Sequence, residues 1–178
     1  LTAWSFFTDP PRSAARAAAQ LAQSVGATLS FDPGSFQMID EMGVEHFLAV
    51  TQDLGIDIFL PNKEEGAVLT GETDPAEIAR QLDLLYPSAL VILKLDADGA
   101  LVWEGGEAHH IPPATNKLVD ATGAGDSFAG GFLAKYLTGH SAADAARFAT
   151  GISAWVIEHP GARPTPGQRL RMIVSGTE

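Results

Sequence analysis

A short segment of the chain, residues 119–128, has the composition of an anion-binding turn with an acid beside it. It reads Val-Asp-Ala-Thr-Gly-Ala-Gly-Asp-Ser-Phe, so Gly123 and Gly125 come directly before Asp126. Apolar residues then recur at helical spacing, which predicts that a helix begins here. The first N–H groups of a helix are unpaired and bind anions, and glycine lets the backbone approach a phosphate closely. An acid in the first turn is placed to accept a proton from an attacking hydroxyl. The segment therefore predicts phosphoryl transfer to an alcohol.

The same residue types also fit purely structural roles. Gly-Ala-Gly is a flexible turn in most sequences, and an aspartate in the first turn of a helix often only caps it. The segment is not a Walker A loop, because no Lys-Ser/Thr follows the last glycine. Nor is it a G-x-G-x-x-G fingerprint, because Phe128 stands where the third glycine would fall. A dinucleotide-binding oxidoreductase domain is therefore disfavoured.

Three motifs together resemble those of the PfkB (ribokinase-like) family of carbohydrate kinases. Residues 120–128 are similar to the C-terminal signature of that family, D-T-x-G-A-G-D-x-F. Residues 57–65 resemble its strand followed by an N-x-x-E motif, and residues 159–162, His-Pro-Gly-Ala, resemble its p-G-A loop. The motifs occur in the family's order and cover most of the chain. The chain is identified as the C-terminal portion of a member of this family.

The resemblance implies roles for the residues of the first segment. Asp126 matches the catalytic base that deprotonates the acceptor hydroxyl. Gly123, Ala124 and Gly125 match the anion hole that stabilises charge on the transferred γ-phosphoryl group.

The resemblance also implies metal ions. Asn62 and Glu65 match the N-x-x-E pair, which helps to organise magnesium and its waters near the phosphates. Without the resemblance, the preferred interpretation of this pair would be a helix cap and an exposed first-turn acid. A loop for a monovalent cation, with potassium as the ion, would take its oxygens from Asp120, Thr122, Val156, Gly161 and Thr165.

ATP is the cofactor that the resemblance implies. The residues expected to lie near the nucleotide are Lys94, Asp96, Gly99, Thr150 and Gly161. Asp96 stands where relatives usually have glycine, and its carboxylate would repel phosphate unless it points away, pairs with Lys94 or contacts ribose hydroxyls. Thr150 lies where relatives often have asparagine, and it lacks the paired donor and acceptor of an amide. Neither departure touches the base or the anion hole, but both point to altered nucleotide affinity.

Alternating helical and strand patterns predict the elements that must position these residues. Helices are expected at residues 12–25, 36–54, 64–69, 75–85, 124–137, 142–157 and 167–173. Strands are expected at residues 27–31, 57–60 and 90–95, and a hairpin at 101–103 and 108–111. This order predicts one α/β domain over residues 1–178, with a mostly parallel sheet flanked by helices. Ligands bind at the carboxyl ends of such strands, where Asp32, Asn62 and Asp96 fall.

Composition narrows the classes of partner. A net charge of -11 without any basic run argues against nucleic acid and against anionic membranes. The chain has no cysteine, and its five histidines share no metal-ligand spacing. No apolar run is long enough to span a bilayer, and the first residues do not resemble a signal peptide. These features favour a cytoplasmic enzyme whose partners are small molecules.

The chain begins with Leu1 rather than methionine, inside what the family folds as one domain. The resemblance implies that relatives carry further strands, a first signature, most sugar-contacting residues and a β lid ahead of this point. We therefore expect a ribokinase-like α/β fold that lacks the N-terminal strands and lid. An open sheet flank favours a homo-oligomer, most simply a dimer. Without a lid to exclude water, the chain alone is expected to be a weak enzyme or inactive.

The resemblance implies an ATP-dependent carbohydrate kinase that phosphorylates a hydroxyl of a sugar or sugar acid. Fructose, ribose and 2-keto-3-deoxygluconate are all compatible, residues 32–35 slightly favour fructokinase or ketodeoxygluconate kinase relatives, and nucleosides stay open. The alternative is a non-catalytic nucleotide-binding or interaction protein derived from the same fold. Asp96, Thr150 and the missing half of the family's domain motivate that alternative.

Overall fold

The protein has an α/β fold in the computed structural model, which describes residues 1–115 and 117–176. Its strands are β1 (Ser30–Phe31), β2 (Ile58–Phe59), β3 (Leu90–Lys94), β4 (Ala100–Glu104) and β5 (Glu107–Ile111). Its α-helices are α1 (Pro11–Ser24), α2 (Phe36–Met42), α3 (Val44–Thr51), α4 (Lys63–Thr70), α5 (Pro75–Leu85), α6 (Ala124–Tyr136), α7 (Ala142–Ile157) and α8 (Gln168–Ser175). Short 3-10 helices are η1 (Ala3–Phe6), η2 (Gln52–Leu54) and η3 (Asp96–Asp98).

The strands form one sheet in the order β1-β2-β3-β4-β5. β1, β2 and β3 are parallel, with Ser30 opposite Ile58 and Phe59 opposite Val91. β4 and β5 form the predicted hairpin, whose turn is Gly105-Gly106. At the free side of β1, Leu1 O accepts a hydrogen bond from Asp32 N at 3.1 Å, and Ala3 N donates to Asp32 O at 3.0 Å. The alternating strands and helices predicted from the sequence are confirmed.

The chain divides into two compact units, which we describe separately. The N-terminal unit comprises Leu1–Leu95 and Trp103–Ala108, and the C-terminal unit comprises Asp96–Val102 and His109–Glu178. The prediction of one domain over residues 1–178 stays a prediction. Among the described residues, no helix is both long and apolar enough to cross a membrane.

The core of the N-terminal unit is an aromatic cluster on the first strands. Phe31 stacks on Phe59 with ring centroids 5.9 Å apart, and the edge of Phe6 meets Phe31 at 5.8 Å. Phe47 of α3 packs against Phe31 as well, with a centroid distance of 6.3 Å. These rings are fully buried, as are Val91, Ile92 and Leu93 of β3. Burying each such ring stabilises the fold by about 1.5–3 kcal/mol, which holds the strand ends in a fixed register.

Local capping explains where the helices of this unit begin and end. The Asp74 side chain accepts hydrogen bonds from Ala76 N at 3.0 Å and Glu77 N at 3.1 Å, so α5 begins at Pro75 as predicted. One helix over residues 36–54 was expected, and this prediction is wrong. Gly43, with φ 82°, separates α2 from α3, because a left-handed residue cannot continue a right-handed helix. β1 is also shorter than the predicted strand at 27–31.

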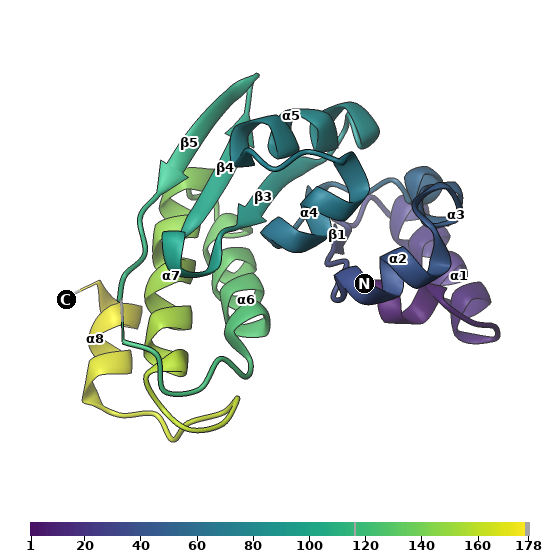
Figure 1. Ribbon diagram of the computed structural model, residues 1–178. Helices are drawn as coiled ribbons and strands as arrows, with labels where there is room; N and C mark the ends of the chain where they lie inside the picture. The colour runs from purple at the N-terminus through teal and green to yellow at the C-terminus, as the bar shows by residue number, and fades with distance from the viewer. Residues whose placement is uncertain (116, 177–178) are drawn as a thin grey trace. The chain divides into compact units, whose positions relative to one another are not determined.

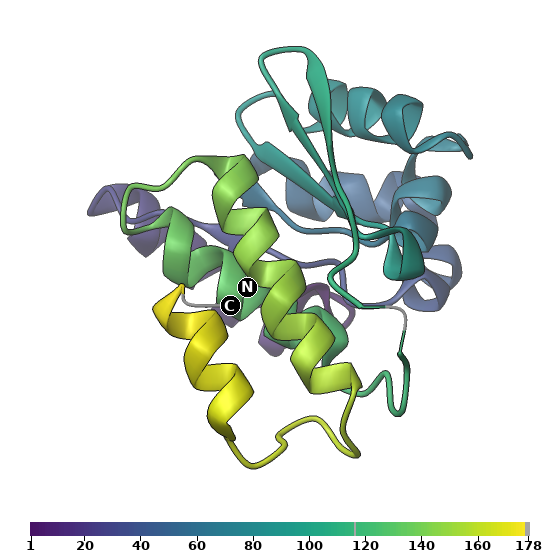
Figure 2. The same ribbon diagram turned by 90° about the vertical axis from the view of Figure 1, so that its left-hand side faces the viewer.

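The C-terminal unit is built on helices α6 and α7, which lie side by side, with α8 against α7 (Figures 1 and 2). The contact is close because Gly131 of α6 faces α7: a Cβ on Gly131 would lie 3.2 Å from Ala149 Cα. Ser153 Oγ of α7 also donates a hydrogen bond to Ala124 O, at 3.1 Å. The first turn of α6 is therefore anchored to its neighbour.

Candidate functional site

Polar side chains gather where the first three strands of the N-terminal unit end. Asp32 follows β1, Asn62 lies just beyond β2, and Lys94 is the last residue of β3. Lys94 Nζ lies 2.6 Å from Asp32 Oδ2, and both side chains are mostly shielded from solvent. The backbone of Asn62 pairs with that of Lys94 in a parallel bridge. We call Asp32, Asn62, Glu65 and Lys94 the strand-end cluster.

Asn62 and Glu65 form a reciprocal cap at the start of α4. Asn62 Oδ1 accepts a hydrogen bond from Glu65 N at 2.8 Å, while Glu65 Oε2 accepts one from Asn62 N at 2.7 Å. The interpretation of this pair as a helix cap is confirmed. Glu65 is not an exposed acid, however, because only 2% of its surface is accessible. The pair is thus rigidly placed at the strand ends.

Burial changes the acidity of Glu65. Desolvation raises the pKa of its carboxyl to about 7, although the hydrogen bond from Asn62 N and the charge of Lys94 act in the opposite direction. The charges of Asp32 and Glu64 add to the rise in pKa. A cation bound nearby would favour the ionised form of Glu65, because it would compensate for the lost hydration.

The donor atoms of the strand-end cluster fit a magnesium ion held through water. Among the described residues, no group of three or more His, Cys, Asp or Glu side chains could hold a metal ion directly. Both oxygens of Asp32 already accept hydrogen bonds, from Gly34 N and Lys94 Nζ. Glu65 Oε1 accepts none within the part of the chain that the structure describes. Magnesium keeps several waters in such sites, and one carboxylate oxygen suffices to orient them.

In the C-terminal unit, Asp120 braces the loop that leads into α6. Its Oδ1 accepts hydrogen bonds from Thr122 N at 2.9 Å and Thr122 Oγ1 at 2.6 Å. Its Oδ2 accepts one from Gly161 N at 2.8 Å, which ties the loop to the segment after α7. The Thr122 hydroxyl, followed by the two backbone donors, lowers the pKa of Asp120 to about 2. The carboxylate that holds this loop is therefore ionised at neutral pH.

The N-terminus of α6 presents unpaired donors beside a glycine that no other residue can replace. Gly123 has φ 81°, and a Cβ there would lie 2.8 Å from Ala162 Cβ. Ala124 N donates to Ala121 O at 3.1 Å. The N–H groups of Gly125 and Asp126 donate to no atom of the described residues. Such groups, at the positive end of the helix dipole, suit an anion.

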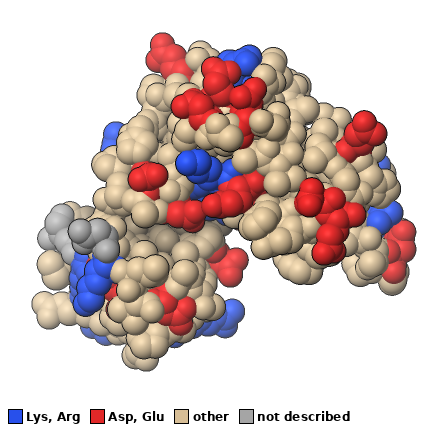
Figure 3. Space-filling view, viewed as in Figure 1, with Lys and Arg blue, Asp and Glu red and all other residues tan. Residues whose placement is uncertain are grey.

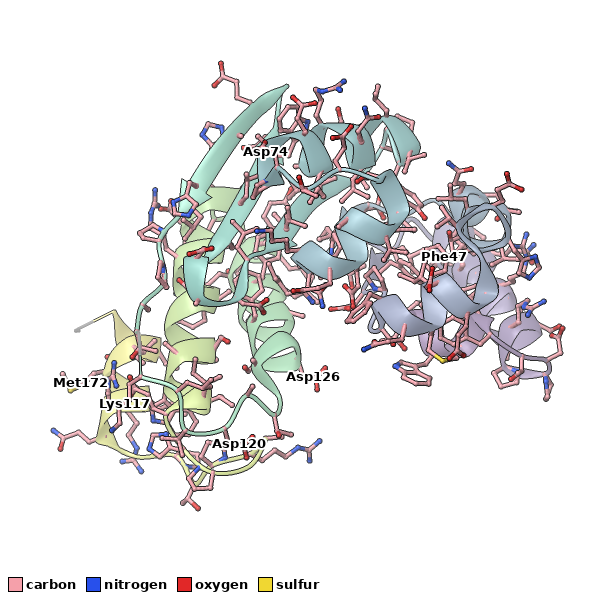
Figure 4. The ribbon with its side chains drawn as sticks, in the orientation of Figure 1. Phe47, Asp74, Lys117, Asp120, Asp126 and Met172 are labelled. Atoms are coloured by element: carbon pink, nitrogen blue, oxygen red, sulfur yellow. The ribbon has the colours of Figure 1, made fainter. Side chains whose placement is uncertain are left out.

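The carboxylate of Asp126 projects from the first turn of α6 (Figure 4). It is exposed, and within the described chain it makes neither a hydrogen bond nor an ion pair. It therefore does not act as a helix cap, which was the structural alternative for this residue. An unengaged carboxylate next to unpaired N–H groups can accept a proton from a hydroxyl whose oxygen attacks an anion bound at those groups.

The turn after β3 contains two residues with a left-handed backbone, Asp96 and Gly99. Asp96 is the one described non-glycine residue with a positive φ, 52°, where aspartate is tolerated better than most residues. Gly99, with φ 88°, leaves no room for a side chain, because a Cβ would lie 2.2 Å from Ile111 O. The ammonium of Lys94 pairs with Asp32, and the pairing of Asp96 with Lys94 stays a prediction. Glycine adopts this left-handed backbone without strain, so Asp96 stands at a position whose backbone suits glycine.

The remaining predicted ligands have varied surroundings within the C-terminal unit. Thr150 is buried, and its hydroxyl donates to Arg147 O at 2.8 Å. Val156 O accepts a hydrogen bond from His159 N at 3.1 Å. Thr165 is exposed, with no hydrogen bond to another described residue. Of the potassium ligands expected from the sequence, the structure joins Asp120, Thr122 and Gly161, and the potassium site stays a prediction.

Two ionic contacts at these sites were not anticipated from the sequence. Asp32 was predicted to lie at a strand end, but its pairing with Lys94 was not predicted. The two residues are 62 positions apart in the sequence, which leaves no local signal of the pairing. Glu158 was not singled out, although its carboxylate accepts a hydrogen bond from Thr115 Oγ1 at 2.6 Å and pairs with Arg169. An acid one residue beyond a helix offers no pattern that distinguishes it from a solvated surface group.

Comparison with known proteins identifies the family. Residues 11–168 match the model of the pfkB family of carbohydrate kinases, so the chain belongs to this family. It is 34% identical over 137 residues to an uncharacterized sugar kinase from Archaeoglobus fulgidus, covering 76% of this chain and 52% of that protein. It is 32% identical over 142 residues to a 2-dehydro-3-deoxygluconokinase from Bacillus subtilis, covering 78% and 43%. The chain spans about half the length of the curated relatives it matches.

Solved structures identify the fold. A fructokinase from Vibrio cholerae O395, in a form with fructose, ADP and calcium bound, superposes with a TM-score of 0.83 at 27% identity. The match covers 100% of this chain and 59% of the fructokinase. An adenosine kinase from Sinorhizobium meliloti superposes with a TM-score of 0.82 at 26% identity, covering 97% and 52%. The ribokinase-like α/β fold expected from the sequence is confirmed.

Proposed function

We propose that the protein is an ATP-dependent carbohydrate kinase that transfers the γ-phosphoryl group of ATP to a hydroxyl of a sugar or sugar acid. The observation that carries this proposal is the N-terminus of α6. There the unpaired N–H groups of Gly125 and Asp126 stand beside the unengaged carboxylate of Asp126. The family membership and the sugar kinases among its relatives support the same chemistry.

In the proposed reaction Asp126 is the general base. Its carboxylate accepts the proton of the acceptor hydroxyl while the hydroxyl oxygen forms a bond to the γ-phosphorus. The bond between that phosphorus and the β–γ bridging oxygen breaks, and ADP leaves with the electron pair. Gly123, Ala124 and Gly125 form the anion hole, in which the unpaired N–H group of Gly125, with that of Asp126 beside it, stabilises charge on the transferred group. Because Asp120 and Ala162 hold this loop in place, little reorganisation accompanies the reaction.

Magnesium would neutralise charge on the phosphates when bound, and Asn62 and Glu65 are the residues proposed to orient its waters. Potassium at the loop of Asp120 and Thr122 would tune the anion hole without entering the reaction. Lys94, Asp96, Gly99, Thr150 and Gly161 are proposed to lie around the nucleotide. For Lys94, phosphate would have to compete with the carboxylate of Asp32.

The acceptor belongs to the class of sugars and sugar acids. The Bacillus subtilis relative is named as a 2-dehydro-3-deoxygluconokinase, and the Vibrio cholerae structure is a fructokinase with fructose bound. The acceptors that these two names imply are rich in hydroxyl groups, which fits a base that acts on an alcohol. The proposal of a dimer in the cytoplasm rests on the sequence alone.

The experiment that tests the proposed function separates binding from transfer. Wild type and Asp126→Asn are compared in two assays. The first is titration calorimetry with magnesium and a non-hydrolysable ATP analogue. The second is sugar-dependent ADP production over a panel of sugars and sugar acids. We expect the variant to bind the analogue with unchanged affinity and to lose transfer by roughly 10²–10⁴-fold, because only the base is removed. Glu77→Gln, which neutralises an exposed first-turn acid of α5, is the matched control and should leave both unchanged.

Other outcomes would change the assignment. Transfer by Asp126→Asn at the wild-type rate would overturn the role of Asp126 as the base. Saturable nucleotide binding without transfer by the wild-type chain would agree with the expected low activity of this chain alone, so it would not by itself favour the alternative of a binding protein, which Asp96 and Thr150 motivate. Absence of saturable nucleotide binding would contradict the proposed function.

A further inference from the structure

The turn that follows α7 holds the anion-hole loop through its backbone. Ile157 O accepts hydrogen bonds from both Val119 N at 2.8 Å and Asp120 N at 3.1 Å. Further along the turn, Gly161 N donates to Asp120 Oδ2. These hydrogen bonds therefore fix the position of Asp120 relative to the end of α7. Whatever orients this end of α7 also orients the loop.

Glu158 lies at this point, and its carboxylate connects three segments of the C-terminal unit. Its Oε1 accepts the hydroxyl hydrogen of Thr115 at 2.6 Å, and its Oε2 pairs with Arg169 of α8. Thr115 Oγ1 in turn accepts a hydrogen bond from Lys117 N at 3.1 Å, at the start of the chain leading to Asp120. The Glu158 side chain is only 11% exposed, whereas that of Arg169 is 44% exposed. The carboxylate is therefore enclosed while its partners approach from two directions.

The charge of Glu158 is well suited to a bracing role. The hydrogen bond from Thr115 is the largest influence that lowers the pKa of Glu158, and the charges of Arg169 and Lys117 add to it. A carboxylate with both oxygens engaged has one orientation, and charge-assisted hydrogen bonds are stronger than neutral ones. Glu158 takes no part in the proposed proton or phosphoryl transfer, so its contacts serve geometry.

We propose that Glu158 is a positioning residue for the anion-hole loop, held in its working orientation by Arg169 of α8. The inference rests on the proposed function, in which this loop binds the transferred phosphoryl group. Through Ile157, the orientation of Glu158 reaches Val119 and Asp120, and so reaches the unpaired N–H groups at the start of α6. The C-terminal helix α8 thereby helps to position the anion-hole loop.

The test measures loop order and nucleotide binding separately. Two quantities are compared in wild type, Glu158→Ala, Glu158→Gln and Arg169→Gln. One is the rate of hydrogen exchange of the amides of residues 118–125. The other is the calorimetric affinity for magnesium with a non-hydrolysable ATP analogue. Removing the Glu158 carboxylate leaves the Thr115 hydroxyl without its acceptor and abolishes the ion pair with Arg169, so Glu158→Ala should speed loop exchange by roughly tenfold or more and weaken nucleotide affinity several-fold. Glu158→Gln keeps an acceptor for Thr115 and should lie between Glu158→Ala and wild type.

Arg147→Gln is the matched control, because it removes an arginine from the surface ion pair with Asp144 at the other end of α7. It should leave loop exchange and affinity unchanged. Loop exchange at the wild-type rate in Glu158→Ala would overturn the inference. If Glu158→Ala speeds exchange throughout α6 and α7 as well as in the loop, the milder variant Glu158→Gln decides the question. Faster exchange confined to the loop in Glu158→Gln would support the positioning role, and exchange at the wild-type rate would overturn it. Faster loop exchange in a protein whose wild type binds no nucleotide would uphold the positioning of the loop and contradict the proposed function.

Discussion

Glu65 both stabilises the fold, through its hydrogen bond at the start of α4, and destabilises it, through the burial of its charge. Its carboxylate completes the cap of α4, yet it lies almost fully buried with a pKa of about 7. A carboxyl whose folded pKa exceeds its unfolded value of 4.5 binds more protons in the folded state between those two values. Stability therefore falls as the pH rises from about 4.5 to about 7, by about 3 kcal/mol in total. Buried charge at this position is costly, which is typical of residues kept for chemistry.

Replacing Glu65 by glutamine should remove this pH dependence. Glu65→Gln keeps an acceptor for Asn62 N but cannot ionise, so its free energy of unfolding should match wild type near pH 4.5 and exceed it by up to about 3 kcal/mol at pH 8. Urea unfolding at both pH values measures the difference. Glu77→Gln, at an exposed acid of α5 that is not among the charges acting on Glu65, is the control and should retain the wild-type pH dependence. Identical pH dependence in wild type and Glu65→Gln would show that Glu65 is not the group responsible.

At the scale of elements, the contact between α6 and α7 decides where a glycine is required. Gly130 and Gly131 are adjacent on α6 but face different surroundings. A Cβ on Gly130 would meet no atom within 4 Å. A Cβ on Gly131 would lie 3.2 Å from Ala149 Cα and 3.4 Å from Ile152 Cγ1. The first glycine is thus dispensable, whereas the second sets the distance between two helices.

The two alanine substitutions should therefore have opposite signs. Gly130→Ala should raise the free energy of unfolding by roughly 0.5–1 kcal/mol, because alanine loses less backbone entropy in a helix. Gly131→Ala should lower it by about 1–3 kcal/mol, because the added methyl must displace the backbone of α7. Chemical denaturation of both variants measures the pair. A stabilising Gly131→Ala would mean that α7 moves away from α6 at little cost.

At the scale of the whole molecule, the dominant property is negative charge. The net charge is -11, and Figure 3 shows acidic side chains spread over the visible face. Self-repulsion of this kind destabilises the folded state at low salt. The expected substrate, ATP, is also an anion, so attraction must come from local features. The unpaired N–H groups of α6 and bound cations are the sources that the structure and the proposal offer.

Salt should therefore stabilise the protein, and the identity of the cation separates two effects. Raising choline chloride from 10 to 200 mM should screen repulsion, and a gain of about 1 kcal/mol would raise Tm by about 2–4 °C. Potassium chloride at the same ionic strength should raise Tm further if the Asp120 loop binds potassium. Thermal unfolding in the two salts measures both effects. Equal Tm values would contradict the potassium prediction and leave charge screening intact.

Local chemistry accounts for what could be predicted. The bounds of α5 and α7 match the sequence-based ranges because Asp74 and Ser141 cap them with their own side chains. The hairpin follows from Gly105-Gly106, and the family follows from three short motifs at residues 57–65, 120–128 and 159–162. The single predicted helix over residues 36–54 was wrong because the pattern of apolar residues continues across Gly43, whereas the backbone does not. Periodicity reports which side chains are buried, not where the chain turns.

The sequence by itself determined the fold class, the family and the candidate base Asp126, since these depend on patterns within a few neighbouring residues. Only the tertiary structure decided the pairing of Lys94 with Asp32, the burial of Glu65 and the two side-chain contacts of Glu158. It also decided that Gly123 has no room for a side chain, because Ala162 lies against it. These properties arise between residues far apart in the chain, whose distance is set by packing of the core and not by local preference.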